Sequence, residues 1–147
     1  MMEACELAVY FPMAQVNVDV LRTELTSNPL IMRDPLDEAK PTPGLEYYLL
    51  FGDDDERNYV LQKLERNPHD KLWSTLTFVF NHAEPAKHCM IMVNYELCGG
   101  KAGHAFGQLL IPLLAKYPGH IVEDTRTGLD ITEVYRGTWE RLFPAAQ

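Results

Sequence analysis

The sequence predicts a single-domain α+β fold, in which helices pack on one face of a mainly antiparallel sheet. Patterns typical of strands and helices alternate along the 147 residues. Two adjacent strand patterns are spaced as a hairpin with a wide loop. The composition, 46% hydrophobic and 23% charged, is that of a folded globular chain and argues against disorder.

The segment from residue 88 to 124 carries the clearest pattern. It starts as an alternating strand, turns at Gly99 and Gly100, continues as an amphipathic helix that stops near Pro118, and ends as a short strand over residues 120–122. The apolar residues of the helix recur every three or four positions, so they form one stripe that needs a partner surface. These residues are Ala102, Ala105, Phe106, Leu109, Leu110, Leu113, Leu114 and Tyr117.

The first third of the chain predicts three more elements and a long loop. Residues 5–11 alternate between apolar and other side chains, as in a strand with one buried face. Asn17 is an N-cap candidate for the helix that follows it, and residues 30–33 are a candidate short strand. Residues 34–44 contain three prolines and are expected to form a loop. Residues 45–51 (LEYYLLF) predict a strand buried on both faces or nearly so.

Further elements follow from capping and alternation. Asp53 and Glu56 have the spacing of a capping box and predict a helix that ends at Asn67. Residues 74–80 predict a strand that forms a hairpin with the strand from residue 88. A final short helix is expected between residues 132 and 143.

The acidity of the chain is concentrated in one segment. Between residues 34 and 56, eight acidic residues accompany one lysine, which accounts for −7 of the net charge of −8. An acidic patch repels nucleic acid and attracts basic partners, so binding to DNA or RNA is not expected. The residues are Asp34, Asp37, Glu38, Glu46, Asp53, Asp54, Asp55 and Glu56.

The sequence patterns give little support for a metal site or for catalytic residues. The acidic run at residues 53–56 could hold a hard cation, but it lacks the alternating ligands of a calcium loop, and a helix N-terminus explains it. The histidines and cysteines lack the CxxC or HxxxH spacing of a zinc site. Cys98 and His104 could pair as thiolate and base, but no third member is evident. No catalytic residue, metal or cofactor is therefore predicted. The zinc candidates considered are His82, His88, Cys89, Cys98 and His104.

Cellular location follows from what the sequence lacks. Three cysteines, an odd number, predict reduced thiols, and we find neither a signal peptide nor an apolar run long enough for a membrane span. A cytoplasmic protein with no membrane association is expected.

The glycine turn resembles part of one enzyme family. Its glycines open a helix, where backbone N–H groups can bind phosphate, although the P-loop pattern is absent. This strand, turn and helix resemble the element with which GNAT acetyltransferases bind the pyrophosphate of acetyl-coenzyme A. The resemblance implies an acyl-coenzyme A dependent transferase as the alternative function. The residues that carry it are Gly99, Gly100, Lys101, Gly103 and Gly107.

A second resemblance gives the preferred hypothesis. Residues 109–128 (LLIPLLAKYPGHIVEDTRTG) resemble stretches of small bacterial immunity proteins, which protect the producing cell by binding a toxin. The resemblance implies an immunity protein whose acidic surface occludes the basic active-site cleft of a cognate toxin. The expected partner-binding residues are Asp53, Asp54, Asp55 and Glu56, flanked by Asp37, Glu38 and Glu46. A third possibility is a ligand-binding or scaffold domain of an oligomer, with apolar strand faces exposed around Met90 and Met92.

Overall fold

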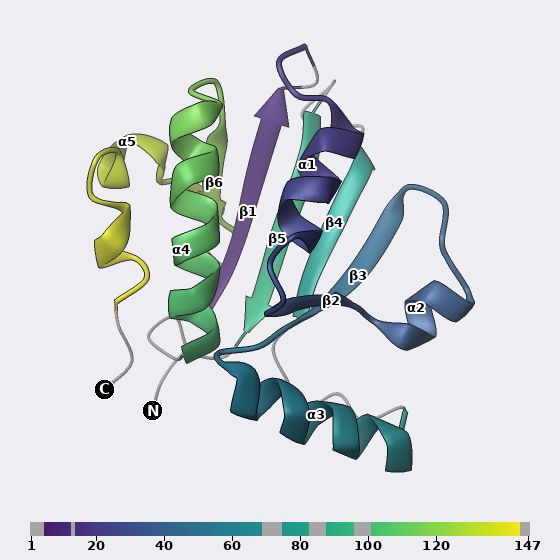
Figure 1. Ribbon diagram of the computed structural model, residues 1–147. Helices are drawn as coiled ribbons and strands as arrows, with labels where there is room; N and C mark the ends of the chain where they lie inside the picture. Colours follow the sequence, from purple (N-terminus) through teal and green to yellow (C-terminus); the bar gives the residue numbers. More distant parts are fainter. Residues whose placement is uncertain (1–4, 13, 69–74, 83–87, 96–100, 145–147) are drawn as a thin grey trace.

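The computed structural model describes residues 5–12, 14–68, 75–82, 88–95 and 101–144 (Figure 1). Within them, seven strands form one antiparallel sheet in the order β2-β3-β4-β5-β1-β6-β7. The strands are β1 (Cys5–Pro12), β2 (Ile31–Arg33), β3 (Leu45–Leu50), β4 (Thr75–His82), β5 (His88–Tyr95), β6 (Ile121–Asp124) and β7 (Leu129–Asp130). The helices are α1 (Val18–Thr26), α2 (Pro35–Ala39), α3 (Asp54–Arg66), α4 (Lys101–Lys116), α5 (Thr132–Tyr135) and the 3-10 turn η1 (Trp139–Arg141).

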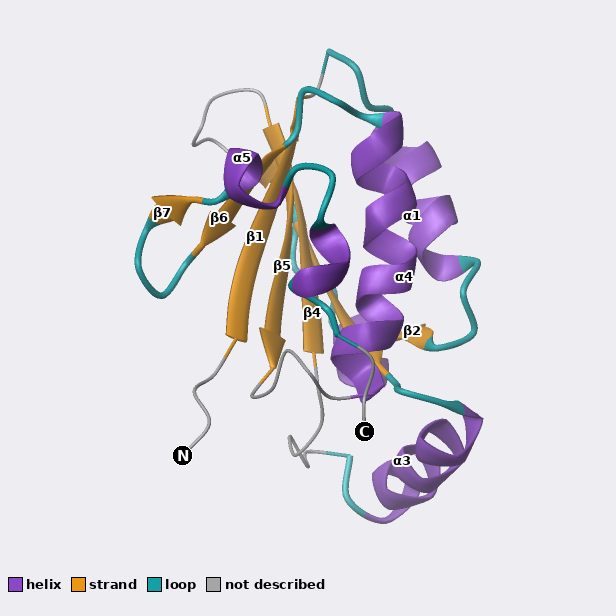
Figure 2. Ribbon diagram, turned by 90° about the vertical axis from the view of Figure 1, so that its left-hand side faces the viewer, coloured by secondary structure: helices purple, strands orange, loops and turns teal. Residues whose placement is uncertain are grey.

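The two helices α1 and α4 lie side by side on one face of the sheet (Figures 1 and 2). The buried stripe of α4 packs with Leu21 and Leu25 of α1 and with alternate residues of the strands in one hydrophobic core. From β1, the core receives Leu7, Val9 and Phe11. The predicted α+β class, with a mainly antiparallel sheet and helices on one face, is confirmed.

Strand β1 holds the centre of the sheet together. It pairs with β5 on one side and β6 on the other, so that Val9 lies opposite both Ile91 and Val122. The segment β5–α4–β6 therefore spans a gap of one strand, and the N-terminal strand fills that gap. The predicted hairpin of β4 and β5 is also present.

Helix α3 packs against a second, smaller core. Leu49, Phe51 and Val60 are buried there, whereas Tyr48 and Leu50 of the same strand belong to the main core. Because successive residues of a strand point to opposite faces, β3 contributes to both cores. This explains why LEYYLLF is apolar on both sides.

Two local predictions were wrong, and one short strand was missed. The proline-rich segment contains α2, because Pro35 occupies the first helical position, where proline's missing N–H is not needed, and the Asp34 side chain accepts from Leu36 N at 3.0 Å. The predicted C-terminal helix is divided into α5 and η1, with Gly137 between them at φ 81°. The short strand β7 was not predicted.

The C-terminal segment folds back onto α4 through close contacts. Phe143 is buried, and its ring meets that of Phe106 edge-on at 5.9 Å. A Cβ added to Gly107 would lie 2.4 Å from the Cβ of Phe143 and 2.5 Å from its Cγ. A glycine at this helix position is therefore required by packing.

We expect Gly107→Ala to lower the free energy of unfolding by about 1–3 kcal/mol, because overpacking against Phe143 outweighs the better helix propensity of alanine. Urea unfolding would measure the loss. Gln108→Ala, one residue on at an exposed position of the same helix, should stay within about 0.5 kcal/mol of the parent. Equal stability of the parent and Gly107→Ala would contradict this account.

Candidate functional site

The acidic segment divides into two groups of carboxylates. One group lies around β2, α2 and the start of β3, and the other surrounds the first turn of α3. Strand β3 connects the two groups. Asp34, Asp37 and Glu46 are buried, so the prediction of a single exposed acidic patch is wrong for these three residues.

Glu46 is a buried member of the first group, with 7% of its surface exposed. Arg22 of α1 donates from Nε to both of its carboxylate oxygens at 3.0 Å, and the hydroxyl of Tyr48 donates to Oε1 at 2.5 Å. Arg22 also pairs with Asp19 at 2.6 Å. A buried carboxylate with this set of donors fixes α1 against β3.

Asp37 has a similar structural role at the end of the sheet. It is buried, and its Oδ2 accepts from Arg33 Nε at 2.6 Å and from Tyr47 N at 3.0 Å. Arg33 Nη1 lies 3.9 Å from Glu46 Oε1, which joins the two clusters. Asp37 and Glu46 are therefore not part of an exposed acidic field, because arginines balance their charges inside the fold.

The ionisation of this network follows its geometry. Burial raises the pKa of Tyr48, and the hydrogen bond to Glu46 raises it further. For Arg22, burial alone lowers the pKa, but the hydrogen bonds to Glu46 and Asp19 outweigh it and raise the value. Arg33 behaves in the same way through Asp37. The network thus favours a neutral tyrosine beside charged arginines.

In the second group, two carboxylates cap α3, as the sequence predicted. Asp53 accepts from Glu56 N at 2.8 Å, and Glu56 reaches back to accept from Gly52 N at 2.9 Å. Lys101, the first residue of α4, donates to Asp53 at 3.2 Å. The bond from Glu56 N, followed by Lys101, lowers the pKa of Asp53. These residues dock the start of α3 beside α4.

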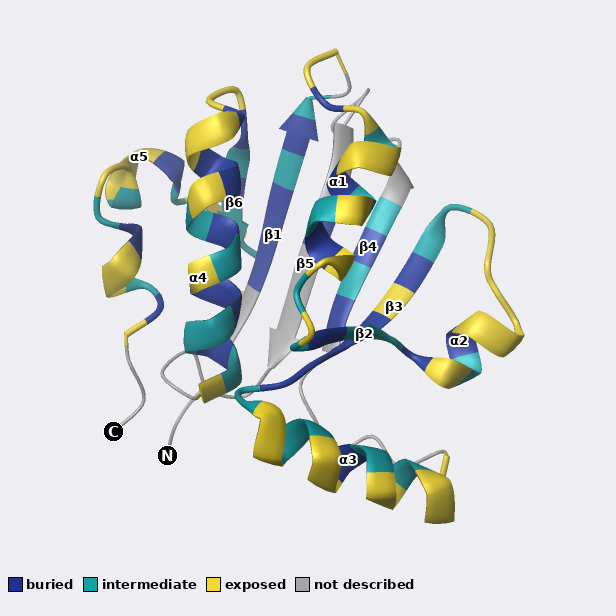
Figure 3. Cartoon of the chain, viewed as in Figure 1, coloured by how far each residue is buried: buried dark blue, intermediate teal, exposed yellow. Residues whose placement is uncertain are grey.

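Two further carboxylates of this group are exposed, in the first turn of α3 that Figure 3 colours as exposed. The side chain of Asp54 is 73% exposed, with Arg57 Nη2 at 3.6 Å, and Asp55 is also exposed. Tyr59, one turn after Asp55, is 58% exposed. The solvent-facing acidity of the site is therefore concentrated at the first turn of α3, and Glu38 of α2 is an exposed carboxylate of the other group.

The residues of the glycine turn are only partly described. Cys98, Gly99 and Gly100 lie outside the described residues. Gly103 and Gly107 are buried in α4, where Gly107 contacts Phe143 rather than a ligand-accessible surface. Lys101 pairs with Asp53.

The candidate zinc residues do not assemble into a described site. Of the five, His104 has a described side chain, and its Nδ1 lies 3.2 Å from the carbonyl of Phe143. Across the described ranges, no group of three or more histidine, cysteine or acidic side chains could hold a metal ion. In the same part of the chain, no helix is long and apolar enough to cross a membrane.

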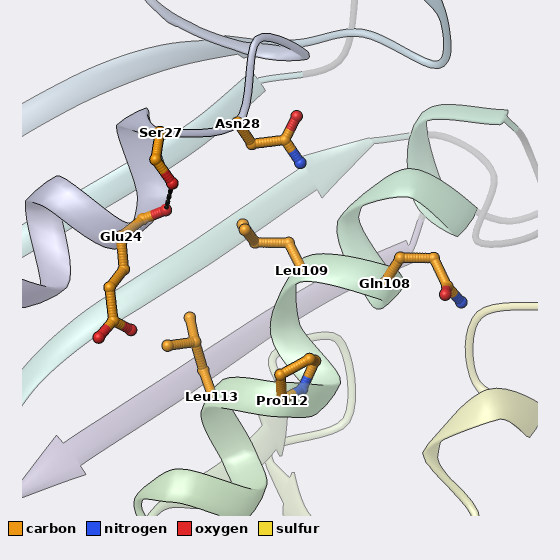
Figure 4. Close-up of a pocket in the computed structure, with 7 residues that line it drawn as sticks. All are labelled: Glu24, Ser27, Asn28, Gln108, Leu109, Pro112 and Leu113. Atoms are coloured by element: carbon orange, nitrogen blue, oxygen red, sulfur yellow. Dashed lines mark hydrogen bonds between the residues drawn. The ribbon is translucent and has the colours of Figure 1, made fainter.

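A groove between α1 and α4 was not predicted. It has a volume of about 380 Å³, within the range of small-molecule sites. Ser27 and Asn28, at the end of α1, face Leu109 across it (Figure 4). Pro112 has no N–H for the Gln108 carbonyl, which adds a polar acceptor beside the groove. The lining is Glu24, Ser27, Asn28, Gln108, Leu109, Pro112 and Leu113.

His120 is a buried polar residue that the sequence did not single out. Its Nδ1 lies 2.5 Å from the carbonyl of Tyr117, and a carbonyl can only accept, so Nδ1 carries the proton. Its Nε2 is, within the described residues, the one buried side-chain nitrogen or oxygen without a hydrogen-bond partner. The ring packs edge-on against Trp139 at 6.0 Å.

Comparisons of the chain with protein-family models, with curated proteins and with solved structures found no match.

We expect Glu46→Ala to lower the free energy of unfolding by about 2–3 kcal/mol, because it leaves Arg22 and the Tyr48 hydroxyl without their acceptor. The loss is below that of a fully buried pair because the Arg22 side chain is 29% exposed. Glu24→Ala, which breaks the surface pair with Lys116, should cost about 0–1 kcal/mol in the same urea titration. Equal losses of unfolding free energy in Glu46→Ala and Glu24→Ala would show that the buried network does not stabilise the fold more than a surface pair.

Tyr48→Phe tests the pH dependence of the same network. The pKa of Tyr48 in the folded protein is raised above its ordinary value of 10.0. Its stabilising effect is therefore complete below about pH 10 and is lost as the pH rises toward the folded pKa. At neutral pH the variant should be less stable by about 1–2 kcal/mol, and the gap should narrow above about pH 10.

Urea unfolding between about pH 8 and 11 would measure that gap, with Tyr59→Phe as the control at an exposed tyrosine. A difference between parent and Tyr48→Phe that stays constant over this range would contradict the assignment.

Proposed function

We propose that this chain is an immunity-type binding protein, which neutralises a cognate bacterial toxin by covering its active site with an acidic surface. The observation that carries the proposal is the exposure of Asp54 and Asp55 at the start of α3, in a chain of net charge −8. Within the acidic segment, these two carboxylates neither cap a helix nor enter the buried network. They are available to a partner.

The position of the pair suits capture of a basic protein. Helix α3 starts beside the first residue of α4 and lies at one end of the sheet, and its outer side is exposed along its length (Figures 1 and 3). A negative surface increases the rate of encounter with a positive cleft. The exposed ring of Tyr59 supplies an aromatic contact of the kind that slows dissociation once the complex has formed.

The other expected binding residues support this surface in different ways. Asp53 and Glu56 fix the first turn of α3 by capping it, so that Asp54 and Asp55 are presented on a rigid element. Glu38 is exposed on α2 and adds to the negative field at longer range. Asp37 and Glu46 hold α2 and β3 in place. The proposal places the protein in the cytoplasm of the toxin-producing cell.

The proposal can be tested by capture of the partner. The tagged protein is used to retain proteins from the lysate of its native cell at low and at high salt, and the retained species are identified by mass spectrometry. Immunity would be supported by a basic protein that is retained at a one-to-one ratio to this chain and is lost at high salt. That protein should also be toxic to cells that lack this chain. Stabilisation of the chain by coenzyme A without protein capture would favour the acyltransferase alternative instead.

With the captured toxin purified, Asp54→Asn combined with Asp55→Asn should slow association by about tenfold at low salt and weaken its salt dependence. The dissociation rate should change less. The control is Glu133→Gln with Glu140→Gln, which removes two exposed acids at the other end of the molecule. Stopped-flow experiments would measure the association rate of each double variant. Equal slowing of association in the two would show that the net charge of the chain, rather than a local surface at α3, controls the rate.

A further inference from the structure

Among the described residues, the face of the sheet opposite α1 and α4 is mostly without a covering helix. In the described part of the chain, no helix lies over β4, β5, β1 and β6 on that side (Figure 2). Helix α3 reaches this face only at one corner, through Leu49 near the end of β3. An uncovered sheet face in an ordinary soluble domain is expected to be polar.

The central row of this face is instead apolar. The strand register aligns five residues across β3, β4, β5, β1 and β6, and four of them are aliphatic. Among those with described side chains, all are half-buried although no helix covers them. The row consists of Leu45, Val79, Met90, Tyr10 and Ile121.

The neighbouring row adds a flat and nearly uncharged surface. Tyr47, with 39% of its surface exposed, aligns with Thr77, and Ala8, which is buried, aligns with Glu123 at the other side of the sheet. Glu123 is the one carboxylate in the two rows, it lies at their margin, and neither row contains a lysine or arginine. A partner recognised by charge therefore gains little here. A surface of the same composition is the better match.

We propose that this face is a homodimer interface, in which two copies of the chain pack sheet against sheet. The five strands contain 34 residues, and a rise of about 3.3 Å per residue with about 4.8 Å between strands gives a face of roughly 540 Å² in flat projection. Projecting side chains make the accessible area larger than this projection. It thus approaches the roughly 800 Å² that each partner contributes to a stable interface.

The placement of the apolar row suits a two-fold axis. Met90 is the middle position of the five, with two members of the row on either side, so a two-fold axis near it brings the row of one copy against the row of the other. Sheets packed face to face lie about 10 Å apart with strands nearly aligned. In this arrangement Glu123 stays at the rim, where water can reach it.

Static light scattering during size-exclusion chromatography tests the dimer on the full chain. The unchanged protein should show twice the monomer mass of 16.8 kDa. Val79→Lys and Tyr47→Lys should each raise the dimer dissociation constant by about tenfold or more, because they bury an unpaired charge at the interface. Val134→Lys is the control, since Val134 is 70% exposed on α5, away from this face, and should leave the dimer intact.

Circular dichroism and thermal unfolding would show that each variant is folded. If Val79→Lys does not fold, Tyr47→Lys alone tests whether this face forms the dimer, because the Tyr47 side chain is already exposed in the monomer. A monomeric unchanged protein at all concentrations would overturn the proposal, as would dimers that survive Tyr47→Lys but are lost in Val134→Lys. The proposal is independent of toxin binding, so failure of either leaves the other standing.

Discussion

Burial of one face of the sheet beneath α1 and α4 is the interaction on which the rest of the structure depends. Leu7, Val9 and Phe11 of β1 lie at its centre, in contact with the inward stripes of both helices. Each such side chain contributes about 1.5–3 kcal/mol relative to an exposed position, against a comparable loss of chain entropy. Because β1 joins β5 to β6, the first strand of the chain links two strands that come from its second half.

The same constraint determines what remains outside the core. A single layer of helices covers one face of the sheet, and period-two alternation sends every second strand residue to the other face. At the β2–β3 edge, that other face is closed by α3 over Leu49. Across the central strands it carries apolar side chains without a helix, which is the physical basis of the dimer proposal.

Elements set by local interactions were predictable from the sequence. Asn17 caps α1 by accepting from Asp19 N and Val20 N, and the pair Asp53 and Glu56 caps α3. Both helices therefore start at residue types that predict a helix N-terminus from the sequence. Helix α2 was missed because a proline reads as a breaker, although at the first helical position it is compatible with the helix. The interruption at Gly137 depends on its positive φ, which a hydrophobic pattern does not reveal.

The candidate site was less predictable because its charges are balanced by arginines that lie outside the acidic segment. Arg33 and Arg57 bound the acidic segment and lie just outside it, yet they pair with Asp37 and Asp54. Arg22 lies 24 residues from Glu46 in the sequence. A count of charges along the chain therefore overstates the exposed field. The groove between α1 and α4 was missed for a similar reason, since its lining comes from two helices far apart in sequence.

The two proposed surfaces use different physical interactions. The start of α3 presents charge on a rigid and solvated turn, which acts on the rate of encounter and is screened by salt. The sheet face presents apolar area, whose burial lengthens the lifetime of a complex. Salt hardly screens this hydrophobic interaction. Two copies of a chain with net charge −8 repel each other, so salt favours their association while it weakens capture of a basic partner. Salt therefore has opposite effects on capture of a basic partner and on dimerisation. The first depends on the carboxylates that the fold leaves exposed, and the second on the strands that no described helix covers.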